Sequence, residues 1–200
     1  MGKKSLPLVN SAVVVLKAAL VTTLGLTETT KMQASSSQKG SLIIESPKDL
    51  TEADISKIHQ ATQKIIADDL KINLSTLPIE EAQEKFKSKV VNGCSLFTKP
   101  VPKHIKSVGI AELEGVCLTL CDPDQVESTG SVPPLAIQST KYNEKKQLLT
   151  VFILVGEQAQ ALLDGANDNN SSSNSDQNAA FNLKDATNIQ ILSKKILQLA

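Results

Sequence analysis

The first half of the chain alternates between long apolar runs and polar stretches. Residues Ser11 to Leu24 are apolar on most faces, which predicts a helix that is buried all round. The Thr- and Ser-rich stretch from Gly25 to Ser37 predicts a loop, and Gly40 to Ile44 predicts a short strand. Thr51, with Asp54 three residues later, predicts the N-cap of a second helix.

Apolar residues at helical spacing continue this second helix to about Asp69. Beyond it, short apolar runs separated by turn residues predict mostly strands. The predicted strands are residues 71–77, 105–110, 116–121, 135–139 and 148–155, with a polar hairpin over 141–146 between the last two. Short helices are predicted from Pro78 to about Lys87 and from Gly156 to Leu163. This mixture predicts an α+β fold in which an antiparallel sheet packs with helices in a single domain.

The composition changes abruptly after Asp164, where a tract of Asn, Ser and Asp begins. Such a polar tract cannot bury a core. We therefore expect three parts: an α+β domain over residues 1–164, a disordered Asn- and Ser-rich linker over 165–181, and a short amphipathic helix over 182–200. Two roles are open for this last helix, which either docks back on the domain or binds a protein partner.

The charge of the chain is balanced, with 21 basic and 21 acidic residues. Balanced charge gives no overall field that would attract nucleic acid. Every basic residue is a lysine, so the planar guanidinium group that commonly grips phosphates is missing. Four Phe and one Tyr offer few surfaces on which bases could stack. The composition is therefore compatible with tRNA binding but does not indicate it.

The N-terminus resembles a signal peptide, because Lys3 and Lys4 precede an apolar run from Leu6 to Leu26. Asn10 and Lys17 interrupt this run and its apolar residues repeat at helical spacing. We therefore interpret it as a core helix, neither a signal nor a transmembrane span. Three cysteines without the spacing of a disulfide framework indicate a reducing compartment, so we expect a cytoplasmic protein without membrane contact.

The stretch from Gly115 to Gly130 carries the most specific pattern in the chain. A predicted strand ends at Cys121, and Val126, Thr129 and Gly130 follow it. This arrangement resembles the zinc-hydrolase motif of the alanyl-tRNA editing family, in which a strand ends as Cys-Gly-Gly-Thr-His-Val before a Thr-Gly turn. The chain departs from that motif at four positions, which hold Asp122, Pro123, Asp124 and Gln125.

Other segments resemble the same family and occur in the family's order. They are Asn10–Leu20 (the metal-binding helix), Gln38–Leu42 (the Gln-Lys-Gly-Ser-Leu strand), Leu50–Ile66 (the long helix), Pro78–Ala82, Leu96–Phe97 and Gln147–Ala159 (the closing strand). The resemblance spans residues 9–163 and is to the free-standing editing proteins, which implies an editing-domain fold of the threonyl/alanyl-tRNA synthetase type.

The resemblance implies a zinc site held by two histidines one helical turn apart, a cysteine and a final histidine. In this chain the four positions hold Asn10, Val14, Cys121 and Gln125. Valine has no donor atom and amides are poor zinc ligands, so we expect that the metal site is lost and that no cofactor binds. The resemblance also implies the substrate-binding residues Gln38, Gly40, Ser41, Thr129 and Gly130.

Two rebuilt sites remain open. Cys117 and Cys121 would face the same side of one strand, where they could hold a metal with His104 and an aspartate, although their spacing matches no standard zinc motif. Alternatively, Asp122 or Asp124 could act as the base in a metal-free hydrolysis, with Gln38 and the Gly40 backbone orienting the substrate.

We therefore expect a relative of the alanyl-tRNA editing proteins that has lost its chemistry. Such a protein would serve translation quality control by binding the tRNA acceptor end or a protein partner. One alternative is an active deacylase that acts in trans on mischarged alanine tRNA through a rebuilt site. A second alternative is a pure protein-interaction module. Whether the chain is an enzyme stays open, with the missing ligands weighing against catalysis.

Overall fold

Helix α1 (Pro7–Leu24) forms the core of the domain in the computed structural model, which describes residues 6–102 and 104–168. From Ser11 to Val21 every residue of this helix is buried. Gly25, with a φ of 67°, ends the helix in the left-handed conformation that glycine adopts without strain. The burial accounts for the apolar character on all faces, and the predicted helix is confirmed.

By length and composition α1 is also able to cross a membrane, with a mean hydropathy of 1.7. In the folded domain, however, 67% of that apolar window is buried against other elements. The core helix of a globular domain satisfies the same length and composition criteria. Burial inside this domain is therefore sufficient to explain the apolar run.

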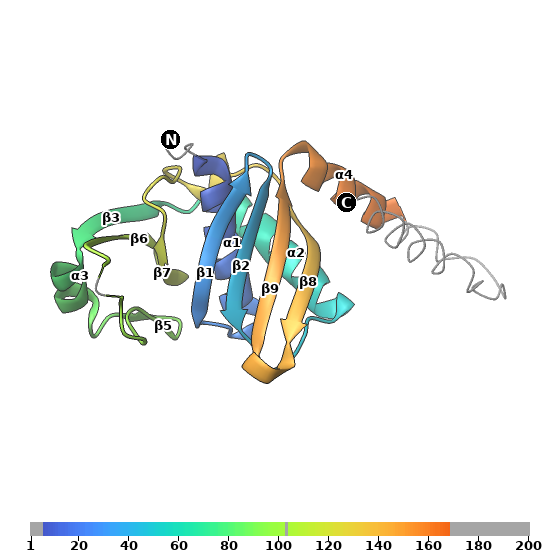
Figure 1. Ribbon diagram of the computed structural model, residues 1–200. Coiled ribbons are helices and arrows are strands. Elements are labelled where there is room, and N and C mark those ends of the chain that lie inside the picture. The colour runs from blue at the N-terminus through green and yellow to red at the C-terminus, as the bar shows by residue number, and fades with distance from the viewer. Residues whose placement is uncertain (1–5, 103, 169–200) are drawn as a thin grey trace, which may run out of the picture. The chain divides into compact units, whose positions relative to one another are not determined.

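A four-stranded antiparallel sheet covers one side of α1 and α2, as Figure 1 shows. Its strands run in the order β1 (Thr29–Ser36), β2 (Lys39–Glu45), β9 (Leu148–Val155) and β8 (Leu135–Asn143). Alternate residues of β2 and β9, among them Leu42 and Val151, are fully buried and belong to the same apolar core as α1. These two residues are register partners, so the sheet joins a strand from the beginning of the domain's sequence to one from near its end.

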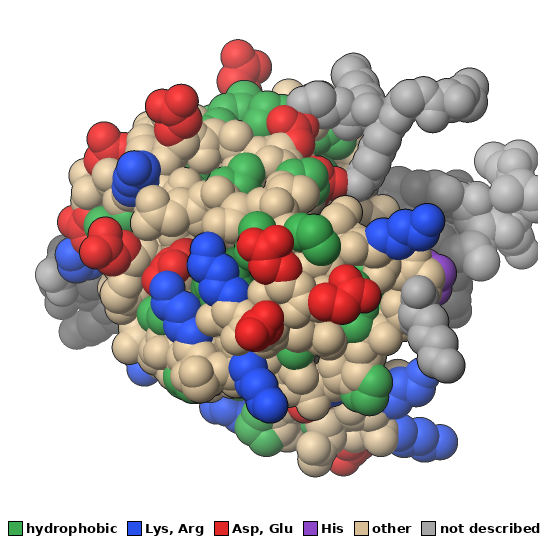
Figure 2. Space-filling model, turned by 90° about the vertical axis from the view of Figure 1, so that its left-hand side faces the viewer, with side chains coloured by type: hydrophobic (Ala, Val, Ile, Leu, Met, Phe, Trp, Pro, Cys, Tyr) green, Lys and Arg blue, Asp and Glu red, His purple; other side chains and the backbone are tan. Residues whose placement is uncertain are grey.

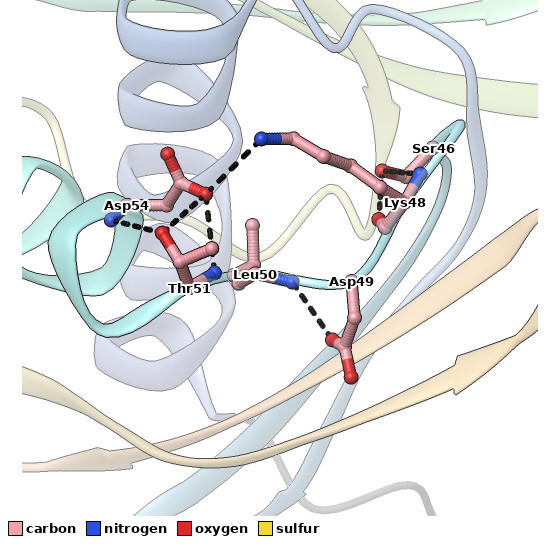
Figure 3. A network of polar contacts seen from close by, with 6 residues as sticks. All are labelled: Ser46, Lys48, Asp49, Leu50, Thr51 and Asp54. Atoms are coloured by element: carbon pink, nitrogen blue, oxygen red, sulfur yellow. Dashed lines mark hydrogen bonds and ion pairs between the residues drawn. The ribbon is translucent and has the colours of Figure 1, made fainter.

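Helix α2 (Glu52–Ala67) begins with a reciprocal capping box, drawn in Figure 3. The Thr51 hydroxyl oxygen accepts a hydrogen bond from the Asp54 backbone N–H at 3.1 Å, and the Asp54 carboxylate accepts one from the Thr51 backbone N–H at 3.1 Å. The Thr51 hydroxyl also donates to this carboxylate at 2.8 Å, and the hydrogen bonds that the Thr51 backbone N–H and hydroxyl donate to it lower the pKa of Asp54 below its usual value. The Lys48 ammonium lies 3.6 Å from the same carboxylate. The N-cap predicted at Thr51 is confirmed.

A second, three-stranded antiparallel sheet has the order β3 (Ile72–Pro78), β6 (Ser107–Leu113) and β7 (Cys117–Cys121). The remaining elements are α3 (Ile79–Phe86), the β4 (Val90–Val91) and β5 (Cys94–Ser95) hairpin, the 3-10 turns η1 (Thr129–Ser131) and η2 (Glu144–Lys146), and α4 (Glu157–Asp168). Strands β1 and β7 each form one edge of their sheet.

The predicted α+β class is confirmed, since the described residues form four helices and antiparallel sheets. The short β4–β5 hairpin and strand β1 were missed. Residues 25–37 were expected to be a loop, but β1 occupies Thr29–Ser36. No residue of this edge strand is fully buried, so the hydrophobic alternation that normally reveals a strand is weak. Its pairing with β2 is what makes it a strand.

Several predicted boundaries also move. Helix α1 begins at Pro7, before the predicted Ser11, and β6 runs over Ser107–Leu113 where residues 105–110 were predicted. Strand β8 continues to Asn143 and leaves only a short hairpin connection at η2, where a polar loop was expected. Helix α4 continues to Asp168, into the segment expected to be linker. Its residues Ala159 and Leu163 pack in a small apolar cluster with Ala136, which anchors the helix. The rest of the predicted linker and the predicted helix over 182–200 lie outside the described residues.

Candidate functional site

The first turn of α1 is joined to the loop that follows β7 by four hydrogen bonds. The Asn10 side-chain amide donates to the Asp124 carbonyl at 3.0 Å, and the Ser11 hydroxyl donates to Gln125 Oε1 at 2.8 Å. The Val126 N–H donates to the Ser11 hydroxyl at 2.9 Å, and the Leu6 N–H donates to the Asp124 carboxylate at 3.0 Å. Two segments more than a hundred residues apart therefore meet at one corner of the domain, which we term the α1–β7 corner and define as residues 6–14 of the chain and residues 121–126.

The α1–β7 corner contains the four positions that the family resemblance assigns to a metal. Asn10 uses its amide N–H to hold the loop. Gln125 accepts from Ser11 with one amide atom and donates to the Asp122 carbonyl at 2.9 Å with the other. Val14 is fully buried and has no donor atom. The Asn10 and Gln125 side chains therefore hold the corner together through hydrogen bonds, and Val14 packs in the core.

Of these four positions, only Cys121 holds the same residue as the family's ligand set. Burial raises the pKa of the Cys121 thiol to about 12, with the neighbouring Asp122 carboxylate adding to the rise. The thiol is therefore protonated at neutral pH, whereas a metal ligand must be a thiolate. The surroundings of Cys121 favour a neutral packing residue.

The two aspartates of the corner hold backbone groups. The Asp124 carboxylate lies at the N-terminus of α1, where a negative charge is favoured by the helix dipole and where the helix has no acidic residue of its own. The Asp122 carboxylate accepts from the Asp124 N–H at 3.3 Å. If one of these aspartates acted as a base, its proton transfer would have to compete with these hydrogen bonds.

The rebuilt metal cluster that the sequence left open is not formed. Among the residues that the structure describes, no three His, Cys, Asp or Glu side chains are grouped so that they could hold a metal ion. Cys117 is fully buried, and burial raises its thiol pKa to about 12, whereas His104 is exposed. Strand pairing fixes the cysteines in the interior, and the turn that carries His104 places it at the surface.

Gln38, Gly40 and Ser41 lie at the beginning of β2 and in the turn before it. Gln38 is exposed, and its carbonyl accepts from the Val155 N–H at 2.9 Å. Gly40 is buried against α1, where an added Cβ would lie 2.8 Å from a methyl group of Val13. Ser41 is half-buried in the middle of the sheet, opposite Phe152. Close packing against α1 is thus a structural reason for Gly40.

Thr129 and Gly130 form hydrogen bonds with the end of α2 and the turn after it. The Thr129 hydroxyl donates to the Ile65 carbonyl at 2.6 Å and accepts from the Leu70 N–H at 2.8 Å, and the residue is fully buried. The Gly130 N–H donates to the Asp69 carboxylate at 2.9 Å. Both residues therefore hold the α2–β3 turn, and their 3-10 turn η1 also contacts α1.

Two residues with important contacts were missed from the sequence. Ser11 connects both Gln125 and Val126 to α1, but a serine within an apolar helix gives no pattern of its own. Lys17 is only 3% exposed and lines a cavity of about 480 Å³ beside β1 and β7. The sequence does mark Lys17, because it is the only lysine within an apolar helix. That feature was taken only as evidence against a signal peptide or a membrane span.

The surface and the comparison with known families add little to these contacts. No family model matches the chain. Figure 2 shows one face of the molecule, on which lysine and acidic side chains are interspersed. That face lacks the continuous basic stripe typical of nucleic-acid binding. The likeness to alanyl-tRNA editing proteins accordingly rests on the sequence motifs, and remains a prediction.

Proposed function

We propose that this protein is a relative of the alanyl-tRNA editing proteins that binds tRNA or a protein partner but does not hydrolyse aminoacyl esters. The proposal rests on the α1–β7 corner. There, the positions that would carry metal ligands hold Asn10, Val14 and Gln125, and both amides are used in hydrogen bonds that connect α1 to the loop. A corner of this kind stabilises the fold but offers neither a Lewis acid nor a free base.

The chemistry of ester hydrolysis supports this interpretation. Hydrolysis of an aminoacyl ester requires an activated water and donors for the developing oxyanion. Pro123 lacks an N–H and adds bulk where the family motif has a glycine. Asp122 and Asp124 both accept hydrogen bonds from backbone N–H groups of the corner and its helix. The groups that would activate water are thus occupied or replaced.

The first ligand to consider is the acceptor end of a tRNA, with a protein partner as the alternative. Without arginine, any contact with phosphates must come from lysines acting as point charges. Such binding would be weak and steeply dependent on salt concentration. We therefore expect a cytoplasmic protein that recognises tRNA only at low ionic strength or with a partner's help.

The test combines metal content, hydrolysis and binding on the purified full-length protein. Zinc is measured by mass spectrometry, hydrolysis is followed on alanine tRNA charged with serine under single-turnover conditions, and binding of uncharged alanine tRNA is measured over a salt series. We expect serine to leave the tRNA at the rate seen in buffer, and tRNA to be retained at low salt.

Two outcomes would contradict the proposal in different ways. Stoichiometric zinc with hydrolysis above the buffer rate would establish an active trans-editing deacylase with a rebuilt site. If neither hydrolysis nor tRNA retention at low salt is observed, tRNA is not the ligand, and the protein-interaction alternative is left.

A further inference from the structure

A cavity of about 480 Å³ lies between the two sheets, and we term it the Lys17 cavity. Its walls come from the edge strands β1 and β7 and from the segment between β5 and β6, and Lys17 of α1 belongs to its lining. Volumes of this order are usual for small-molecule sites. The walls are largely apolar, with Met32, Leu96, Phe97 and Val108 among them.

Lys17 is the unusual member of this lining because its charge has little compensation. The residue is 3% exposed, and among the described residues its ammonium group has one hydrogen bond, to the Leu118 carbonyl at 3.3 Å. An ammonium group has three N–H donors. Removal of a charge from water is unfavourable unless the charge is paired, so Lys17 is held in a state that an added anion would stabilise.

The groups around Lys17 compensate its charge only in part. Burial lowers the pKa of the Lys17 amine, and the nearby Cys94, Cys117 and Glu28 only partly oppose this effect. Cys117 is protonated at neutral pH, since burial raises its pKa to about 12. The Glu28 carboxylate accepts a hydrogen bond from the Thr98 hydroxyl at 2.8 Å. Asp122, the other acidic residue of the lining, accepts a hydrogen bond from the Asp124 N–H.

A second polar group of the lining also has unused capacity. The hydroxyl oxygen of Thr29, at the start of β1, is buried and has no hydrogen-bond partner among the described residues. A buried hydroxyl without a partner is uncommon in folded proteins. Lys31 and Lys99, both exposed, add positive charge to the lining, and Lys99 is paired with Glu45. An ammonium group with unused donors and a hydroxyl without a partner match the acceptors of a carboxylate.

We propose that the Lys17 cavity is a binding site for a small monocarboxylate with an apolar body, whose carboxylate pairs with the Lys17 ammonium group. The apolar chain of the ligand packs against Met32, Leu96 and Phe97. This site goes beyond the proposed function, because an aminoacyl ester carries no carboxylate. It stands whether or not the protein binds tRNA.

The test uses octanoate and octan-1-ol as matched probes, which share the apolar chain and differ in the anionic group. Titration calorimetry at neutral pH reports the affinity of each probe. We expect octanoate to bind at least about tenfold more tightly than the alcohol, in line with a charge-assisted hydrogen bond.

The decisive variant is Lys17→Met, with Lys31→Met as the matched control. Lys17→Met keeps the length of the side chain, and we expect it to weaken octanoate binding about tenfold or more and to leave octanol binding unchanged. Lys31→Met removes an exposed lysine of the same lining and should change octanoate affinity by less than about threefold. Circular dichroism establishes that each variant is folded.

Two results would overturn the proposal. The first, which remains decisive if Lys17→Met does not fold, is equal affinity of the wild-type protein for octanoate and octanol, or no measurable binding of either. The second is full octanoate affinity in folded Lys17→Met.

Discussion

The ring nitrogen Nε2 of His59, on α2, accepts a hydrogen bond of 3.0 Å from the backbone N–H of Ile137, on β8. This contact joins the helix to an edge strand of the four-stranded sheet. Because Nε2 is an acceptor here, the imidazole must be neutral at that atom. Partial burial also lowers the pKa of His59. The fold is therefore built around an uncharged His59.

The first prediction concerns the pH dependence of stability. The pKa of His59 is lower in the folded protein than in the unfolded chain, whose histidine titrates near about 6.5. The stabilisation is thus complete above that value and is lost as the pH falls toward the folded pKa, because the unfolded chain then binds more protons. Urea unfolding between neutral and mildly acidic pH measures the loss.

The two histidines of the chain provide the control. His59→Gln keeps an acceptor for the Ile137 N–H but cannot be protonated, so the loss of stability between neutral and mildly acidic pH should become smaller. His104→Gln alters an exposed residue and should leave that loss as in the wild type. A flattened profile in His104→Gln alone would show that His59 is not the titrating group.

The second prediction concerns the Thr129 hydroxyl, which is bound to both Ile65 and Leu70. Thr129→Val keeps the shape but leaves a buried carbonyl and a buried N–H without a partner, so we expect a loss of about 2 kcal/mol in the free energy of unfolding. Thr129→Ser retains the hydroxyl and should lose less. Equal losses in the two variants would indicate that the methyl group, and not the hydroxyl, holds the turn.

The third prediction concerns the close approach of β2 to α1. An added Cβ at Gly40 would lie 2.8 Å from a methyl group of Val13, which is 1% exposed and cannot move aside easily. We expect Gly40→Ala to reduce the free energy of unfolding by about 1–3 kcal/mol, as overpacking usually does. The double variant Gly40→Ala with Val13→Ala should be less unstable than the sum of the single variants. Additive losses would argue against direct contact.

The fourth prediction tests the family likeness through the metal. If the α1–β7 corner corresponds to the editing site, the triple variant Asn10→His, Val14→His and Gln125→His should complete a ligand set with Cys121. We expect one equivalent of Co²⁺ or Zn²⁺ to bind, with the thiolate-to-cobalt absorption band as the measurement. The same variant with Cys121→Ser should lose that band.

Absence of binding in the folded triple variant would contradict the correspondence of the two sites. The wild-type protein provides a further comparison, since its Cys121 thiol is protonated at neutral pH and has no second strong ligand beside it in the motif. A band of equal strength in the wild type would mean that other residues hold the metal.

The elements that could be predicted are those fixed by neighbours in sequence. The N-cap at Thr51 follows from a side chain reaching a backbone group three residues away. Helix α1 was evident from its long, mostly apolar run with helical spacing, and β9 from a short apolar run bounded by turn residues. Strand β1 was missed because its residues carry little alternation, and its conformation depends on hydrogen bonds to β2.

The candidate site divides in the same way. The motifs suggested that α1 and the loop after β7 belong to one site, and the hydrogen bonds of Asn10 and Ser11 do connect these segments. The Thr129–Gly130 turn was expected at that site as well, yet it contacts the end of α2. Motif spacing alone cannot reveal this, because the turn's partner lies some sixty residues earlier in the chain.

The sequence by itself determined the α+β class, the N-cap of α2 at Thr51 and most strands, because periodicity and caps are local properties of the chain. It also determined that Val14 cannot bind a metal. Only the tertiary structure decided that Lys17 is buried beside a cavity, that His59 is an acceptor and that Thr129 holds a turn. Burial and hydrogen bonding of a single polar side chain depend on partners distant in sequence, and no local pattern records those partners.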